Sequence, residues 1–498
     1  MTARNRLFCG VAICALFAAG EASAQTDAPV STQMQQLHQQ IQQLQQQLQS
    51  LQTRVNTQAQ QAPPAEAASA AAPAPHITQS PGNRFSIESP DGRYSIGLTM
   101  QLHFDAGDYV NYHPDSKVTS PHDLNSGINA RRARFGFLGK LDGDWAYTFV
   151  YDFGGTNDSG PGGTNGPGIE KAYLTYNGLY KGPYPLAFDL GYQDVPFTLD
   201  EATSSNDILF MEKSSSQAVA AGIAAGDNRS AFGVRSNDNR YWAGIYLTGP
   251  VSGTTHAFPQ QYGATGRLTY QVIQAPDYSL HLGINAEGLL KAPTTDTPAE
   301  VRSISLSDRP ELRIDTSSLL STGALGTATN PVDNAAVYGV ELAGNYQNLF
   351  IQSEGFNYNV SREGLPANTF WGAYVEGAWT LTGEEHHYIP ASGAYGSINP
   401  AHPFSLSSMG IGAWELAARY SYINLDDNTG SAIAGGAPKS NGVAGGRQQV
   451  VTLGVNWYPN NNVRFTLNYL HGVVDKPAAA GEAGASFDAV AVRTQIAF

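Results

Sequence analysis

The sequence predicts an all-β protein: a transmembrane antiparallel β-barrel of about 16 strands, preceded by a short N-terminal coiled-coil helix. From Tyr94 to Asp105, polar and apolar residues alternate without a break, which places all the apolar side chains on one face of a strand. The same alternation recurs to the last residue, Phe498, and Tyr and Phe often stand at the ends of the apolar faces, as expected where a strand meets lipid. The mean hydropathy is −0.27 and no run of about 20 apolar residues occurs, so a spanning helix is not expected.

The N-terminus has the features of an export signal. A short apolar block, Leu7–Ala19, follows two arginines and precedes Ala22-Ser23-Ala24, a small-x-small cleavage site. We therefore predict a signal peptide over residues 1–24, cleaved before Gln25. Both cysteines, Cys9 and Cys14, lie inside it, so the mature chain is expected to contain no thiol. A barrel behind an export signal indicates the outer membrane of a Gram-negative cell, with outer-membrane lipid around it.

The segment after the signal predicts a helix and a linker. From Met34 to Val55, apolar residues recur at alternating spacings of 3 and 4 within a Gln-rich background, which is a heptad seam. We predict a periplasmic coiled-coil segment over residues 25–58, the alternative being a Gln-rich disordered tail. Residues 59–83 are rich in Ala and Pro and are predicted to be a linker. The barrel domain is predicted over residues 84–498.

Sixteen segments of the barrel domain alternate as strands. An even number returns both ends of the chain to the same side of the membrane, so a further candidate, Arg302–Asp315, is assigned to a loop. The short turn Leu141–Asp144 and the long Gly-rich connections elsewhere distinguish a periplasmic end from an outer end. The predicted strands are Tyr94–Asp105, Ala130–Phe137, Trp145–Phe153, Ile169–Asn177, Leu186–Gln193, Ser230–Arg235, Arg240–Thr248, Tyr262–Gln271, Tyr278–Leu290, Ala335–Tyr346, Phe350–Tyr358, Phe370–Thr382, Trp414–Ile423, Val450–Tyr458, Val463–His471 and Ala489–Phe498.

Alternation also assigns charged side chains to the lumen, in equal numbers of each sign. For any one of them, an ion pair that stiffens the barrel wall is the alternative to a role in the pore. Arg419 is a candidate partner of Glu415, four residues away on the same face. The predicted lumen cations are Arg132, Arg134, Lys171, Arg235, Arg267, Arg419, Arg464 and Arg493, and the predicted anions are Asp105, Asp152, Asp189, Glu287, Glu341, Glu354, Glu376 and Glu415.

Several segments together resemble the phosphate-selective porin O and P family, from about Arg84 to the C-terminus. They are Ala130–Phe137 with its double Arg, Pro196–Ser205 continuing to Phe210–Lys213, Leu381–Glu384, Trp414–Tyr420, Thr452–Tyr458 and the terminal Phe498.

The resemblance implies a homotrimeric porin of 16 strands for small hydrophilic solutes, whose third loop, here Val195–Gln217, folds into the lumen beside a file of basic residues. Arg131 and Arg132 match the double Arg of the family, Glu170 matches an acidic residue near the constriction, and Lys213 matches a basic residue that closes the third loop. The chain departs from phosphate-specific members at Glu201, where they have Lys, at Asn206, where a basic residue is usual, and at Met100, where they have Arg.

These observations lead to a predicted solute path and three functional hypotheses. The first is an outer-membrane porin for small anions such as phosphate. The second is a porin for uncharged solutes such as sugars, with Tyr173, Trp242, Tyr246 and Tyr374 available for stacking. The third is a tether to the cell wall through residues 25–80. The residues predicted to line the path are Arg131, Arg132, Arg134, Glu170, Lys171, Asp194, Glu201, Asp207, Lys213, Arg235, Arg267 and Arg419.

No enzymatic activity, cofactor, metal site or nucleic-acid partner is expected. The segment Glu384-Glu385-His386-His387 contains metal-ligating residue types, but we assign it to a solvated outer loop because no further ligands are suitably spaced.

Overall fold

The chain consists of two compact units, Met1–Ala72 and Pro73–Phe498. The computed structural model describes residues 42–50, 53, 75–80, 84–114, 124–154, 166–180, 185–251, 258–295, 300–429, 441–476 and 485–498. In the first unit, residues 42–50 form an α-helix, as the heptad spacing predicts. The predicted signal peptide and the remainder of the coiled-coil segment, except residue 53, lie outside the described residues, as does most of the predicted linker. Among the described residues, no helix is both long enough and apolar enough to cross a membrane.

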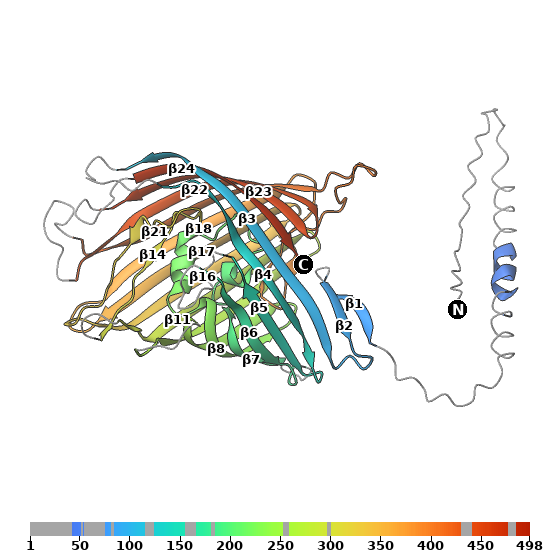
Figure 1. Ribbon diagram of the computed structural model, residues 1–498, viewed down its shortest axis with the longest axis horizontal. Coiled ribbons are helices and arrows are strands. Elements are labelled where there is room, and N and C mark those ends of the chain that lie inside the picture. Colours follow the sequence, from blue (N-terminus) through green and yellow to red (C-terminus); the bar gives the residue numbers. More distant parts are fainter. Residues whose placement is uncertain are drawn as a thin grey trace, which may run out of the picture. The chain divides into compact units, whose positions relative to one another are not determined.

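Sixteen antiparallel strands form a closed barrel, as predicted (Figure 1). Each strand pairs with the next along the chain, and the last pairs with the first, from Ala497↔Gln101 to Ser486↔His113. The strands are β3 (Ser95–His113), β4 (Gly127–Leu141), β5 (Trp145–Asp152), β6 (Gly168–Tyr176), β7 (Leu186–Val195), β8 (Gly226–Asn237), β9 (Tyr241–Val251), β10 (Tyr262–Gln274), β11 (Tyr278–Lys291), β16 (Val332–Tyr346), β17 (Leu349–Arg362), β18 (Asn368–Thr380), β21 (Ala413–Asp427), β22 (Val443–Asn460), β23 (Val463–Asp475) and β24 (Ala485–Ala497).

The alternation of the sequence determines which side chains face out. In β3, Ile96, Leu98 and Phe104 are exposed on the outer face, whereas His103 and Asp105 are buried on the inner face. A closed barrel inverts the usual arrangement, because its apolar face meets lipid and its polar face lines the lumen.

A hairpin precedes the barrel at the end where the chain terminates (Figure 1). It consists of β1 (His76–Ser80) and β2 (Arg84–Glu88), and β2 pairs with β3 from Ser86↔Gly97 to Glu88↔Ser95, beyond the point where β24 ends. β1 falls within the range that we predicted to be linker. Five residues between a Pro/Ala-rich stretch and a turn give too short an alternation to be recognised from sequence.

Within the part of the chain that the structure describes, three long connections enter the barrel and pack against its inner wall. The third loop, predicted over Val195–Gln217, spans residues 196–225 and contains α2 (Leu199–Ala202) and α3 (Ser215–Gly222), and α3 packs against β17, β18 and β21. The fifth loop (residues 292–331) carries the two-residue strands β12 (Thr294–Thr295), β13 (Val301–Arg302), β14 (Ser307–Asp308) and β15 (Leu320–Ser321). Consistent with the prediction for Arg302–Asp315, these short strands pair with each other and not with the barrel sheet.

The third connection, residues 381–412, enters from the opposite end, and we call it the turn-end segment. It joins β18 to β21 and carries β19 (Tyr388–Ile389) and β20 (Ala394–Tyr395). The end of β18 lies on the side of the short turn at residues 142–144, so the assignment of Glu384–His387 to a solvated outer loop was wrong. His386 is buried, and its Nε2 lies 2.7 Å from Glu415 Oε1. Because successive strands run in opposite directions, counting them from β3 places the end of β18 on the side of this short turn.

Candidate functional site: the constricted lumen

The third loop lies between the other two inserted connections. Its Met211 packs with Leu312 and Leu319 of the fifth loop. Its Leu199 and Phe210 pack with residues of the turn-end segment, among them Ala394 and Tyr395. Apolar contacts on both sides therefore hold this loop across the lumen.

Arginines of the barrel wall bind the backbone of the third loop. Arg464 donates to the carbonyl oxygens of Ile208 and Leu209 at 2.7 and 2.9 Å. Arg419 donates to the carbonyl of Glu212 at 2.8 Å. A guanidinium presents five N–H donors in a planar fork, which suits it to hold several carbonyl groups of an irregular segment. These cations fix the position of the loop.

A carboxylate of the wall caps the short helix of the same loop. Glu354 on β17 accepts hydrogen bonds from the backbone N–H groups of Leu199 and Asp200, at 2.8 and 3.1 Å. Tyr374 donates its hydroxyl to the same carboxylate at 2.7 Å. The first N–H groups of a helix have no partner within the helix, so the wall supplies the acceptor.

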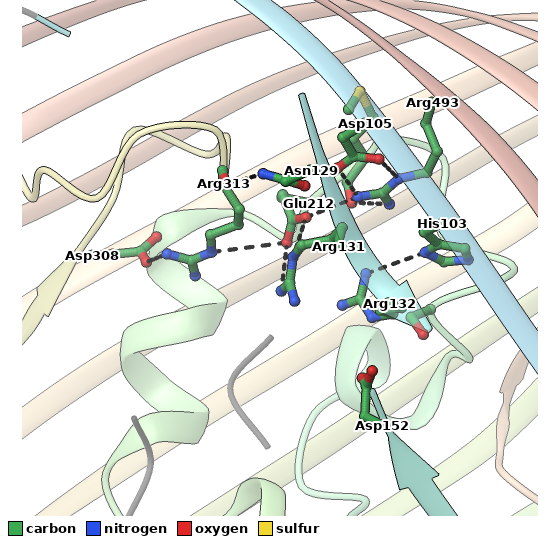
Figure 2. Close-up of polar contacts among 12 residues, drawn as sticks. His103, Asp105, Asn129, Arg131, Arg132, Asp152, Glu212, Asp308, Arg313 and Arg493 are labelled. Carbon is green, nitrogen blue, oxygen red and sulfur yellow. Dashed lines mark hydrogen bonds and ion pairs between the residues drawn. The ribbon is translucent and has the colours of Figure 1, made fainter. Parts of the chain in front are cut away.

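A cluster of arginines surrounds Glu212 where the third loop meets β4 and β24 (Figure 2). Arg131 binds Glu212 through two hydrogen bonds of 2.8 and 3.2 Å, and Arg493 reaches it at 3.0 Å. Arg313 of the fifth loop approaches within 3.9 Å. Although burial acts to raise it, the pKa of Glu212 is lowered well below its ordinary range by the charges of Arg131, Arg132, Arg493 and Arg313. The carboxylate therefore stays ionised and holds the cluster together.

Two β-bulges turn neighbouring charged residues into the lumen. In β4 the register passes from His103↔Arg132 to Phe104↔Ala130, which leaves Arg131 as the extra residue. In β6 a similar shift leaves Glu170 as the extra residue beside Lys171. Strict alternation would send one member of each pair to lipid, and a bulge removes that constraint.

Arg132 differs from the other lumen arginines in its partners. Its side chain is buried, and its Nη1 lies 3.4 Å from His103 Nδ1 (Figure 2). Its Nε has no hydrogen-bond partner, and among the described residues no carboxylate lies within 4.0 Å of its guanidinium. His103 Nε2 in turn lies 3.1 Å from Asn206 Oδ1, which fits a neutral imidazole that accepts from Arg132 and donates to the third loop.

A cavity of about 590 Å³ lies in the lumen between the third loop, the turn-end segment and the walls from β3 to β9. We call it the chamber. Arg84 and Asp207 line it, together with eight charged side chains that form four pairs of opposite sign. The pairs are Arg134–Glu170 at 2.6 Å, Lys171–Asp194 at 2.6 Å, Lys213–Glu201 at 2.6 Å and Arg235–Asp189 at 2.9 Å.

Aromatic rings form another part of the chamber wall, next to the turn-end segment. Tyr173, Trp242, Tyr246 and Tyr395 line it. Trp242 donates its indole N–H to the carbonyl of Ala391 in the turn-end segment at 3.1 Å. The chamber is therefore amphipathic, with paired charges beside aromatic rings.

Comparison with known proteins identifies the family. Residues 96–498 match the family described as phosphate-selective porin O and P. The chain belongs to this family. This porin is 25% identical to Porin O of Pseudomonas aeruginosa over 405 residues, which cover 78% of this chain and 85% of that protein. It is also 29% identical over 231 residues to an uncharacterised protein of Caulobacter vibrioides, a match that spans 46% of this chain and 40% of that relative.

Solved porin structures align with most of this porin. The anion-selective porin from Comamonas acidovorans aligns with 81% of this chain and 100% of its own, with 15% identity and a TM-score of 0.47. The outer-membrane protein OmpT of Vibrio cholerae aligns with 82% of this chain and 98% of its own, with 12% identity and a TM-score of 0.46.

The residues predicted to line the solute path separate into two groups in this porin. Arg131 and Arg132 lie in the cluster around Glu212, Arg419 lies behind the third loop, and Arg267 holds the turn-end segment. The other eight line the chamber: Arg134, Glu170, Lys171, Asp194, Glu201, Asp207, Lys213 and Arg235.

Arg267 and Arg419 are engaged in buried ion pairs. Arg267 binds both oxygens of Glu341, at 2.8 and 2.9 Å, and also the carbonyl of Gly393 at 2.7 Å. Arg419 pairs with Glu311 of the fifth loop at 2.7 Å. The pairing of Arg419 with Glu415 expected from their spacing was wrong, because the fifth loop, distant in sequence, brings a carboxylate closer.

Sequence reasoning missed two parts of the chamber wall. Arg84, at the start of β2, lines the chamber beside Tyr173 and Asp207. Its alternation with Phe85 and Ile87, both exposed, is the signal that could have revealed it. No comparable signal marks the turn-end segment, whose position depends on contacts across the lumen.

Proposed function

We propose that this porin passes small hydrophilic anions, phosphate among them, in preference to cations. Arg132 carries the proposal, because its guanidinium has no carboxylate within ion-pair distance among the described residues. Counted over the residues that the structure describes, the cluster around it has one more positive charge than negative. Its cations are Arg131, Arg132, Arg313 and Arg493, and its carboxylates are Asp105, Glu212 and Asp308.

A single excess charge acts strongly in such a place. In a narrow lumen with protein on every side, the effective dielectric constant falls well below that of water and salt screens less. The cluster does not line the chamber, but its excess charge attracts an anion in the lumen and repels a cation. The names of the matched family and of the relative Porin O fit this substrate class.

Selectivity for phosphate over other anions is expected to be modest. Lys213, the basic residue that closes the third loop, is paired with Glu201, so its charge is compensated at the chamber. Met100 brings no charge to the same wall. We therefore propose a general anion preference.

The reversal potential across a KCl gradient tests this proposal, measured on purified channels in planar bilayers. Arg132→Gln should move the potential toward the value of a non-selective pore. Arg93→Gln is the matched control, because Arg93 lies outside the chamber and pairs with Asp142 at an exposed turn. Cation preference in the wild-type channel, or an unchanged potential in Arg132→Gln, would contradict the proposal.

Uncharged solutes are a second candidate class, favoured by the rings that line the chamber. Tyr173 is half-buried on the chamber wall, and its face suits the apolar face of a sugar ring. Trp242 and Tyr246 also line the chamber but are only 1% and 2% exposed, and Tyr374, the fourth predicted aromatic, lies outside the chamber lining, buried against Glu354. Liposome swelling with sugars of increasing size, compared with salts of matched hydrodynamic radius, separates this class from the anions.

We also propose that the N-terminal helix associates three copies of the chain. Leu44 and Leu48, four residues apart in the helix at residues 42–50, are 60% and 64% exposed. An exposed apolar seam of this kind is stabilised by packing against other helices. Deletion of residues 31–60 should lower the melting temperature of the trimer.

A tether to the cell wall through residues 25–80 is a further candidate role of this segment. A loss of cell-wall association on deletion of residues 25–80, with conductance unchanged, would support it.

A further inference from the structure

A small hairpin projects from the turn-end segment at the rim of the barrel, and we call residues 403–411 the rim hairpin. Ser405 and Gly410 form a β-bridge, in which the N–H of Ser405 donates to the carbonyl of Gly410 at 3.0 Å. Its base is fixed to β22, because the N–H of Phe404 donates to the carbonyl of Pro459 at 2.7 Å. The hairpin is therefore an ordered element with a defined tip.

The base of the hairpin rests on the aromatic residues at the rim of the barrel. Trp457 stacks on Trp414 and on Phe465, with ring centroids 5.5 and 5.4 Å apart. Phe404 contacts the ring of Trp457 edge to face, with centroids 5.4 Å apart. The indole N–H groups of Trp414 and Trp457 both donate to the carbonyl of Ile411, at 3.2 and 2.9 Å. Trp414 and Phe465 lie on the exposed outer face, so the hairpin is attached to the lipid side of the wall.

The tip of the hairpin exposes two large apolar side chains. Leu406 is 88% exposed and Met409 is 83% exposed, the largest values among the exposed apolar residues of the described chain. From Pro403 to Trp414 the sequence contains no charged residue. Insertion of this hairpin into an apolar phase would therefore bury no charge.

We propose that the rim hairpin inserts Leu406 and Met409 into the boundary between head groups and acyl chains of the adjacent membrane leaflet. Tryptophans at the rim of an outer-membrane barrel lie at this boundary, and they bind the hairpin directly. An uncharged tip with two exposed apolar residues, held at that depth, gains free energy by entering lipid. Continuity with the lipid-facing wall favours lipid over a second protein as the occupant.

Fluorescence quenching in lipid vesicles tests this inference. The mature chain expected from cleavage before Gln25 lacks cysteine, so Leu406→Cys can be labelled alone with a nitrobenzoxadiazole dye. The full mature chain is reconstituted into phosphatidylcholine–phosphatidylglycerol vesicles that contain lipids spin-labelled at the head group or along the acyl chain. Met409→Cys is the second labelled position. Asp277→Cys is the matched control, because it lies in an exposed short turn at the same end of the barrel.

Labels at positions 406 and 409 should show blue-shifted emission and loss of intensity with spin-labelled lipid, while the label at 277 should be quenched by aqueous iodide alone. Iodide quenching at 406 equal to that at 277 would overturn the inference. Protection without lipid quenching, together with energy transfer between labelled copies, would also overturn it by assigning the hairpin to a contact between subunits.

Discussion

Lys213 Nζ lies 2.6 Å from Glu201 Oε2, so the third loop presents a compensated ion pair to the chamber. Gln217 donates its amide to the same carboxylate oxygen at 2.8 Å. The family resemblance places a Lys at the position of Glu201. Relative to that pattern, Glu in place of Lys at position 201 replaces two cations with one ion pair. The constriction therefore has two fewer units of positive charge.

Glu201→Gln should increase anion preference, because it removes one negative charge from the chamber wall beside Lys213. A change of one charge is worth about 1 kcal/mol at close range even in water, which corresponds to roughly a fivefold change in the permeability ratio. The measurement is the reversal potential in a KCl gradient. Glu300→Gln, at an exposed position, is the charge-matched control and should leave the potential unchanged.

Anion preference should also increase as pH falls. Burial raises the pKa of Asp207, against the opposing charge of His387, so this chamber carboxylate is protonated at a higher pH than an ordinary Asp. Since the raised pKa means that negative charge is lost on acidification, the chamber becomes more positive between neutral pH and the ordinary Asp pKa of about 3.9. Asp207→Asn should reduce this pH dependence of the reversal potential, and Asp277→Asn should preserve it. A flat profile in the wild-type channel would contradict the expectation.

Gly393→Ala should lower the single-channel conductance, because it moves the turn-end segment further into the lumen. Gly393 has a φ of +61°, and a Cβ added there would lie 2.7 Å from Cβ of Trp242, which forces the turn-end segment away from the wall. Gly383 also has a positive φ, of +102°, but a Cβ there meets nothing within 4 Å. Both substitutions carry the left-handed backbone penalty of about 1–2 kcal/mol. Conductance should therefore differ between the two variants, and an equal conductance would show that the segment does not restrict the flow.

Arg419→Gln should destabilise the barrel interior. It leaves the buried carboxylate of Glu311 without its cation and removes a hydrogen bond to the carbonyl of Glu212. Loss of one partner of a buried pair costs about 3–5 kcal/mol. Arg447→Gln removes a half-exposed pair with Asp475 and should cost about 0–1 kcal/mol. Thermal unfolding in detergent, followed by circular dichroism, measures both, and equal melting temperatures would contradict a role for Arg419 in holding the loop.

The alternation of the sequence was sufficient to predict the barrel and most charged residues of its inner wall, but not Arg131 and Glu170, which β-bulges turn inward. Every charged residue that alternation assigned to the lumen is buried or half-buried there, from Asp105 on β3 to Arg493 on β24. Because side chains alternate with a period of two, each strand can turn either its polar face or its apolar face to the lumen. Lipid outside the barrel and water inside it favour the polar face in the lumen. The even strand count follows because the chain must close on itself.

The sequence did not determine which of these charges meets the solute, and the tertiary structure did. Arg267 and Arg419 share the lumen-facing pattern of Arg134 and Arg235, yet the first two bind inserted segments and the last two line the chamber. Pairing depends on which connection lies opposite each strand, and those connections are held by contacts between residues far apart in the chain. The spacing of residues along one strand does not predict such contacts. The residues that form the constriction are therefore determined only by the tertiary structure.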